Sequence, residues 1–316
     1  MIEFTDHSNA KKQKNEETTP SFPLIEEIES VEEVMERTNE LLQSAHHNGA
    51  VLIRRPPLQT ARDFDALVQA FKLPNFPYER SLSNAVRINR TERVFTANEA
   101  PPETTIPLHH EMAQTPFYPT WIFFFCEQAP ETGGATPICH SGQLWKALEK
   151  ECPGFARDCE VHGLRYNNTM PSQNDTASGL GRSWRSTFSV EKKEEAENRL
   201  QELGYTWKWL KDECLRVTTP RLPAVLDTND QKTFFNQLIA AFHGWKDSRN
   251  DPTKSITFGN GTPIDPVHIE KTSKLAEKFT YDLDWQSGEL CIIDNRISMH
   301  GRKLFTGKRS VLASMS

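Results

Sequence analysis

The chain has 316 residues, a formal net charge of −6 at pH 7, 36% hydrophobic residues and 25% charged residues, which is typical of a soluble globular protein. The acidic balance and the lack of a basic stripe argue against a nucleic-acid-binding protein. The longest apolar run, at 121–126, is far too short to span a bilayer.

The first 22 residues are polar and charged and contain no apolar stretch of the kind found in signal peptides. We therefore expect a flexible tail at 1–22 and a single domain at 23–316, with an insertion around 141–285. Six cysteines without C-x-x-C spacing favour free thiols in a reducing compartment over a disulfide framework or a zinc site. These features together predict a cytoplasmic protein.

The N-terminal part of the domain predicts two helices separated by a strand. Ser30 and Glu33 have the spacing of a capping box and predict a helix that ends near Asn48. Residues 50–53 predict a short buried strand, and Thr60 predicts the start of a second amphipathic helix. We interpret this opening as a packing layer without a chemical role.

The next segments predict buried strands. Residues 94–98 predict a strand or loop that enters the core, and the continuous apolar run at 121–126 predicts a strand buried on both faces. Gly133 and Gly134 predict a turn, a strand follows from Thr136, and Ser141 predicts the cap of a helix that reaches residue 152.

The remaining elements are short and alternate in type. We predict strands at 161–166, 290–293 and 310–314, a polar loop at 167–181, a hairpin at 205–217, and helices at 194–203, before Trp245 and at 265–279. Many short strands with a few helices favour a mainly β, α+β architecture. Its core would be a double-stranded β-helix, or jelly roll, flanked by helices.

His109 and Glu111 are candidate metal ligands separated by one residue, His110. Side chains alternate faces in an extended backbone, so the first two point the same way and His110 points away. An imidazole nitrogen beside a carboxylate oxygen suits divalent iron, and a second histidine would complete the 2-His-1-carboxylate facial triad. His300 offers that ligand near the C-terminus, and Arg309 follows at a spacing that suits carboxylate binding.

These motifs resemble those of a known family, the TauD/TfdA group of Fe(II)/2-oxoglutarate dioxygenases, and within it the clavaminate-synthase-like and SyrP-like members. The matching segments lie at 94–99, 107–114, 133–137, 181–184 and 293–314. The resemblance implies that His109, Glu111 and His300 bind iron. We interpret the other histidines, His110 included, as structural or solvated.

The resemblance also implies a site for the co-substrate 2-oxoglutarate. Arg309 would bind its far carboxylate through two parallel charge-assisted hydrogen bonds. The hydroxyl of Thr136 would donate a hydrogen bond to the same carboxylate. Arg302 and Lys308 are neighbouring alternatives to Arg309. Arg302 is the weaker of the two, because it lies only two residues from a proposed iron ligand.

Substrate contacts are expected from family-like local motifs. The candidates are Asn98, Arg182, Trp184, Arg185 and Asn236. The two arginines would suit an anionic group on the substrate, although solvated surface charges are an equal alternative. We predict that the polar segment 167–181 is a lid that is mobile when the site is empty; a plain surface loop is the alternative.

The resemblance implies that Fe(II), 2-oxoglutarate and O2 together hydroxylate a C–H bond of a small amino-acid-derived substrate, with release of succinate and CO2. That substrate would be free or tethered to a carrier protein. Desaturation or epoxidation is the alternative outcome, and a non-catalytic jelly-roll binding protein is the alternative of another class. Because Glu111 supplies a carboxylate, no position is free for chloride as in the related halogenases. No nucleic acid or membrane partner is expected, and the oligomeric state is left open.

Overall fold

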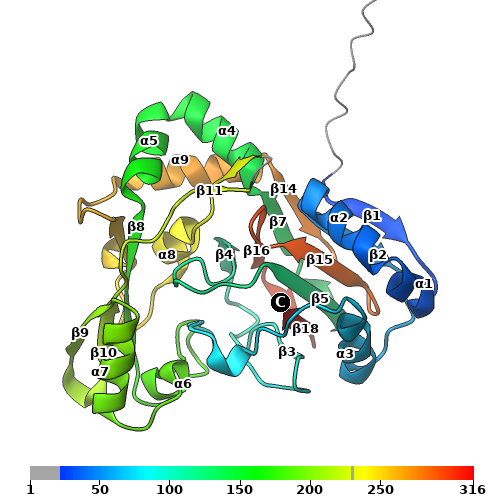
Figure 1. The fold of residues 1–316 in the computed structure, drawn as a ribbon, viewed down its shortest axis with the longest axis horizontal. Coiled ribbons are helices and arrows are strands. Elements are labelled where there is room, and N and C mark those ends of the chain that lie inside the picture. The colour runs from blue at the N-terminus through cyan, green and yellow to red at the C-terminus, as the bar shows by residue number, and fades with distance from the viewer. Residues whose placement is uncertain (1–21, 229–230) are drawn as a thin grey trace, which may run out of the picture.

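The computed structural model describes residues 22–228 and 231–316, so the predicted tail lies outside the described residues except for its last position. A six-stranded sheet forms the centre of the fold (Figure 1). Its order is β1 (Leu24–Glu27), β2 (Ala50–Arg54), β15 (Leu290–Asp294), β5 (Trp121–Gln128), β18 (Ser310–Met315) and β3 (Phe95–Thr96). The apolar run predicted as a doubly buried strand is β5, near the middle of this sheet.

A four-stranded sheet packs against one face of the central sheet. Its order is β14 (Thr280–Leu283), β7 (Thr136–His140), β16 (Ser298–Arg302) and β4 (Ile106–His109). Leu52, Phe124 and Cys291 from the first sheet share one apolar cluster with Ile138 and Leu283 from the second. The two facing sheets confirm the predicted jelly-roll core. A short ribbon of β6 (Thr132–Gly133) and β17 (Phe305–Thr306) extends its edge.

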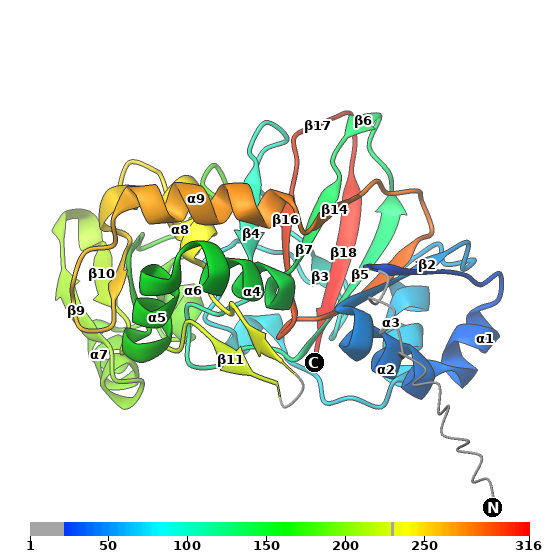
Figure 2. The same cartoon turned by 90° about the horizontal axis from the view of Figure 1, so that it is seen from above.

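The other face of the six-stranded sheet is covered by the N-terminal helices (Figure 2). These are α1 (Val31–Glu36), α2 (Thr38–Asn48) and α3 (Ala61–Ala70). Both predicted N-caps are present: the Ser30 hydroxyl accepts from the Glu33 backbone, which is one of the two contacts of the predicted capping box. Thr60 forms a reciprocal capping box with Asp63. Gly49, with a φ of 80°, ends α2 and directs the chain into β2.

Helices and a third sheet extend the fold on the side of the four-stranded sheet (Figure 2). The helices there are α4 (Ser141–Glu151), α5 (Pro153–His162), α8 (Leu238–Gly244) and α9 (Pro266–Glu277). The third sheet contains β13 (Ile256–Phe258), β8 (Leu164–Met170), β10 (Leu215–Thr218) and β9 (Thr206–Trp209), and packs on α6 (Trp184–Phe188) and α7 (Lys193–Glu202). A ribbon of β11 (Leu226–Asp227) and β12 (Lys232–Thr233), and 3-10 turns at Tyr78–Arg80, Lys211–Glu213 and Pro252–Lys254, complete the described elements.

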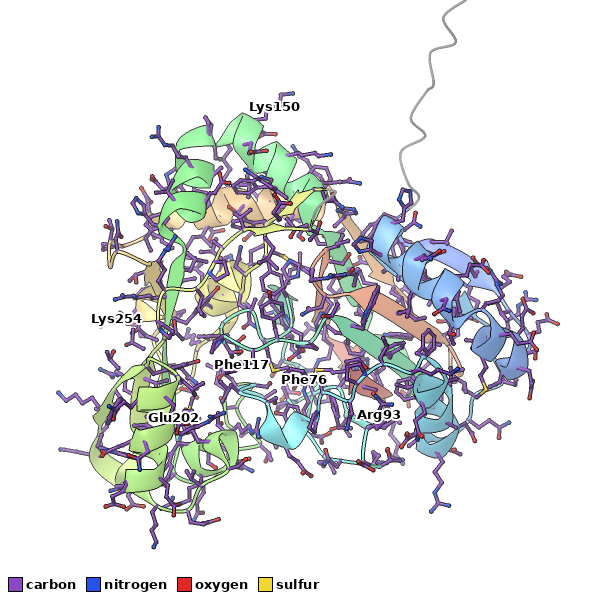
Figure 3. The ribbon with its side chains drawn as sticks, in the orientation of Figure 1. Phe76, Arg93, Phe117, Lys150, Glu202 and Lys254 are labelled. Carbon is purple, nitrogen blue, oxygen red and sulfur yellow. The ribbon has the colours of Figure 1, made fainter. Side chains whose placement is uncertain are left out.

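Polar side chains of the outer helices are exposed, such as Lys150 on α4 and Glu202 on α7. Lys150 points away from the protein in Figure 3. No helix in the described ranges combines the length and the apolar composition needed to cross a membrane. All six cysteines are free thiols, as predicted.

Four predicted boundaries were wrong. The single helix predicted to run from Ser30 to near Asn48 is divided at Arg37 into α1 and α2. The side chain of His140, not of Ser141, caps α4 by accepting from the Gln143 backbone N–H at 3.3 Å. The strand predicted from residue 161 begins at Leu164, because α5 continues to His162 and ends at Gly163, whose φ of 61° stops the helix. The predicted loop at 167–181 accordingly begins as part of β8.

Candidate metal centre and substrate cavity

Two of the predicted ligands are cross-strand neighbours. His109 ends β4 and is paired directly with His300 on the antiparallel strand β16. Residues opposite one another in such a pair project to the same face of the sheet, and here the two ring centroids are 4.4 Å apart. The sheet register therefore brings together two imidazoles that are far apart in the sequence.

Glu111 completes the cluster from the turn that follows β4. Its backbone is held by the Asn295 side chain, whose Oδ1 accepts from the Glu111 N–H at 2.7 Å and whose Nδ2 donates to the Glu111 carbonyl at 3.0 Å. The candidate ligand atoms of His109, Glu111 and His300 all lie within 4.8 Å of one another. The three predicted iron ligands thus converge on one point.

His110 diverges from this point, as the alternation of side chains predicts. Its ring is buried against Phe235, with centroids 4.7 Å apart, and its Nδ1 lies in hydrogen-bond contact with the backbone oxygen of Asn295. Burial lowers the pKa of His110 to about 3, so this imidazole is neutral at physiological pH. It serves as an internal contact of the turn.

The protonation states of the cluster suit a divalent metal. Burial, together with the neighbouring His300, lowers the pKa of His109 to about 4, and its Nδ1–H donates to the Pro107 carbonyl at 2.9 Å, which leaves Nε2 free. Burial alone would raise the pKa of Glu111, but Arg87 and the two histidines outweigh it and hold that pKa well below its usual range. Neutral imidazole and ionised carboxylate are the forms that bind metals. The residues present therefore fit a divalent metal ion.

Arg87 is a site residue that the sequence did not reveal. Its guanidinium donates to Glu111 Oε2 at 2.8 Å, and both side chains are buried. The guanidinium also lies 5.1 Å from the ring centroid of Tyr78 and 5.4 Å from that of Phe95. The segment contains several arginines with similar neighbours, so no local pattern marks Arg87.

A small cavity of about 40 Å³ separates His300 from Arg309 and is also lined by Phe124 and Thr136. Arg309 donates through Nε to the Gly134 carbonyl at 3.0 Å and through Nη2 to Thr136 Oγ1 at 3.3 Å. Burial lowers the pKa of Arg309 to about 10, with a further contribution from Arg302. The guanidinium remains charged at neutral pH beside the candidate metal ligands.

The geometry separates Arg309 from its two alternatives. Arg302 donates through Nη1 and Nη2 to the backbone oxygens of Ala100, Pro101 and Thr104 at 2.7–2.9 Å, so both terminal nitrogens are committed to holding that loop. Lys308 is exposed and does not line the cavity. Arg309 is therefore the cation placed to receive a carboxylate.

A larger cavity of about 350 Å³ adjoins the same cluster. Its wall includes His109 and Glu111, and Asn98 lines both this cavity and the smaller one. The amides of Asn84, Gln114 and Gln237 add neutral polar groups. Residues 177–180 of the predicted lid also line it, so this segment contacts the site; its mobility stays a prediction.

The structure places Arg182 outside the lining of this cavity. Its side chain is buried, and it donates to the backbone oxygens of Glu79, Ser81 and Ser186 at 2.7–3.0 Å. These contacts tie two loops together and leave the guanidinium little capacity for a ligand.

Three further substrate candidates also lie away from the cavity lining. Trp184 is fully buried and donates through Nε1 to the Glu213 carbonyl, and Arg185 forms an ion pair with the Glu213 side chain at 3.0 Å. Asn236 is buried and donates to the Ala224 carbonyl. The pocket for an anionic substrate group that we expected at Arg182 and Arg185 is therefore not part of the site that we propose.

The sequence matches the family described as taurine catabolism dioxygenase TauD, TfdA family, over residues 17–315. A clavaminate synthase-like protein of Arabidopsis thaliana is 38% identical over 272 residues, which are 85% of this chain and 82% of that protein. The dapdiamide synthesis protein DdaC of Enterobacter agglomerans is 27% identical over 284 residues, 84% of this chain and 82% of that protein.

Among solved structures, an asparagine oxygenase in complex with Fe(II), 2S,3S-3-hydroxyasparagine and succinate aligns with a TM-score of 0.55. The identity is 11%, and the alignment covers 92% of each chain. A putative α-ketoglutarate-dependent 2,4-D dioxygenase from Burkholderia xenovorans aligns with a TM-score of 0.50 and 16% identity, over 93% of this chain and 94% of the other. At these identities the two structures are evidence for the fold alone.

Proposed function

The chain belongs to the TauD/TfdA family of dioxygenases, and from that membership we propose that it hydroxylates a C–H bond of a small amino-acid-derived substrate with Fe(II), 2-oxoglutarate and O2, releasing succinate and CO2. The observation that carries the proposal is the convergence of His109, Glu111 and His300 at the boundary of two cavities. A metal held by three ligands on one face leaves the opposite face open for reactants.

The residues divide the work between the two cavities. The three ligands would hold Fe(II), which when bound supplies the O2 chemistry that side chains cannot provide. On the smaller side, Arg309 and Thr136 would bind the far carboxylate of 2-oxoglutarate. The Trp285 Nε1–H donates to the hydroxyl oxygen of Thr136 at 2.8 Å, and this contact orients the Thr136 side chain.

The larger cavity would hold the substrate. Among its charged lining residues, Arg87 contacts Glu111 and Asp247 contacts Arg249 at 2.6 Å, whereas Lys246 is exposed. The remaining polar lining consists largely of neutral amides and hydroxyls. Such a wall suits amide, carbonyl and hydroxyl groups, as in an amino-acid-derived molecule. The 27% identical relative is described as a dapdiamide synthesis protein, which agrees with a small-molecule substrate.

Two finer points belong to the proposal. A carrier-tethered substrate is the alternative to a free one, and desaturation or epoxidation is the alternative to hydroxylation. Glu111 favours oxygen transfer over halogenation, because it occupies the position that chloride would need. Mass spectrometry of the product separates desaturation, which removes two hydrogens, from hydroxylation or epoxidation, each of which adds one oxygen.

The enzyme class is tested by spectroscopy without oxygen. Adding Fe(II) and 2-oxoglutarate to the wild-type protein is expected to give a weak visible charge-transfer band, which His109→Ala and His300→Ala should abolish. His47→Ala is the matched control, because His47 is exposed on α2, and it should keep the band. If wild type shows no band, or if the ligand variants retain it, the assignment is wrong.

The substrate is sought by screening a metabolite library for compounds that increase succinate release. Small amino-acid derivatives with neutral hydrogen-bonding groups are expected to be active. Activity confined to wholly apolar compounds would refute the proposed use of the amide-lined wall.

A further inference from the structure

Two side chains from distant parts of the chain, Asn295 and Arg87, contact Glu111 at different places. Asn295 holds only the backbone of Glu111, through its N–H and its carbonyl. The carboxylate itself is reached by Arg87, which donates to Oε2 at 2.8 Å, while His300 Nε2 lies 3.5 Å from the same oxygen. Arg87 thus contacts the oxygen that faces the candidate metal position.

We propose that Arg87 is a positioning residue that orients the carboxylate of Glu111 for metal binding. This inference rests on the proposed metal centre and assigns a role that the sequence motifs do not include. Arg87 acts through Glu111, and it is not itself a ligand.

Arg87 is well placed to fix a side chain, because it is itself held. Its side chain is 6% exposed and lies against the rings of Tyr78 and Phe95. It lines both the small and the large cavity, so it forms part of the wall between them. A guanidinium held in this way presents a donor in a fixed direction, which a flexible ammonium does not.

A glutamate side chain has three rotatable bonds, and a charge-assisted hydrogen bond is the contact that selects one orientation here. Partners that orient the ligands of protein metal sites typically contribute about 10- to 100-fold to metal affinity. We therefore expect Arg87→Met to weaken metal binding by about 10- to 100-fold.

The sign of this effect separates orientation from charge balance. Arg87 is a cation beside a cation site, so removing its charge would by itself strengthen the binding of a divalent metal. If Arg87 only neutralises the buried Glu111, Arg87→Met should bind metal as tightly as wild type or more tightly. Because Arg87→Met also raises the pKa of Glu111, weaker binding is assigned to lost orientation only where Arg87→Lys, which keeps the charge, binds metal more weakly too.

The experiment measures Mn(II) binding to the full chain by electron paramagnetic resonance, without 2-oxoglutarate or substrate. Arg87→Met is compared with wild type, and the same substitution is made in a Glu111→Gln background. If Arg87 acts through the carboxylate, the substitution Arg87→Met should weaken Mn(II) binding only where Glu111 is present. Arg90→Met is the matched control, because Arg90 forms a more exposed ion pair with Glu127 at 3.0 Å, and it should leave Mn(II) binding unchanged.

Thermal unfolding followed by circular dichroism reports whether Arg87→Met folds. Arg87→Lys is measured in either case, because lysine keeps the charge but cannot reproduce the planar fork. It should fold and bind Mn(II) several-fold more weakly than wild type. Equal binding by a folded Arg87→Met or Arg87→Lys variant, or an equal loss in the Glu111→Gln background, overturns the role of Arg87.

Failure of the metal centre would look different. In that case wild type would bind no stoichiometric Mn(II), or His109→Ala would bind it as well as wild type does. Stoichiometric binding that depends on His109, combined with an unaffected Arg87→Met, refutes the role of Arg87 alone.

Discussion

The Asn295 amide supports both the metal cluster and the stability of the turn that carries it. Asn295 is fully buried, and its side chain makes three hydrogen bonds. Two of them go to the backbone of Glu111, at 2.7 and 3.0 Å, and one goes to the Pro119 carbonyl at 2.8 Å. We predict that Asn295→Ala destabilises the protein and weakens the metal site together.

The size of the effect follows from the groups left without partners. Asn295→Ala leaves one N–H and two carbonyl groups unpaired, and a buried polar group without its partner costs roughly 1–3 kcal/mol. Allowing for partial entry of water, the expected loss is about 3–6 kcal/mol in the free energy of unfolding. This is a large part of the roughly 5–15 kcal/mol by which a domain is usually stable.

The assay is equilibrium unfolding in urea without metal, paired with a Mn(II) titration of the folded variant. Asn260→Ala is the matched control. Asn260 is exposed and accepts one hydrogen bond, from the Thr262 N–H at 2.9 Å. Its loss should cost no more than about 1 kcal/mol and should not change Mn(II) affinity.

A second variant, Asn295→Asp, keeps the size of the side chain and the acceptor for the Glu111 N–H. It places a carboxylate oxygen against two carbonyl oxygens, so it should also be destabilised at neutral pH. If Asn295→Ala unfolds within about 1 kcal/mol of wild type, the three hydrogen bonds do not support the turn and the argument fails.

Three further predictions concern other parts of the site and the core. Arg309→Lys should raise the dissociation constant for 2-oxoglutarate about 10- to 100-fold, since hydrogen bonds to charged groups contribute roughly 1.5–3 kcal/mol; titration of the charge-transfer band measures it, and an unchanged constant removes Arg309 from the co-substrate site. Gly181→Ala would place a Cβ 1.6 Å from the Asp175 carbonyl oxygen, so it should speed limited proteolysis of the lid segment and lower substrate turnover without changing Mn(II) affinity; a wild-type cleavage rate contradicts this. With a thiol reagent at pH 8, only the partly exposed Cys214 should react quickly, because the other five cysteines are buried and less accessible. Burial also raises the pKa of Cys139, for example, to about 12; several fast thiols would contradict the described packing.

The sequence predicted those parts of the fold and site whose signals are local. The caps at Ser30 and Thr60 depend on side chains three residues apart, and the buried strand at 121–126 is a continuous apolar run. The alternation of side chains around His109 likewise depends on a few neighbouring residues. These features can therefore be predicted without knowledge of the tertiary structure.

The parts that escaped prediction depend on distant pairings. Arg87 and Asn295 reach Glu111 from 24 residues before it and 184 residues after it, and nothing in their own neighbourhoods marks them. The motif at 181–184 shows the opposite difficulty. Arg182 and Trp184 look like functional residues, yet the structure uses them to satisfy buried backbone groups. A buried polar contact and a ligand contact have the same appearance in a sequence.

Two of the proposed metal ligands lie on core strands, whereas the larger cavity is lined mainly by loops, so the reaction type can stay constant while the substrate differs. His109 and His300 are held by the register of two core strands, and Glu111 is tied to that sheet through Asn295. The larger cavity is lined mainly by loop segments, including 83–85, 104–105 and 177–180. Because loops tolerate substitution better than paired core strands, the lining can change while the metal geometry stays the same. The proposed metal ligands therefore indicate the class of reaction. The loop residues that line the larger cavity determine which substrate fits.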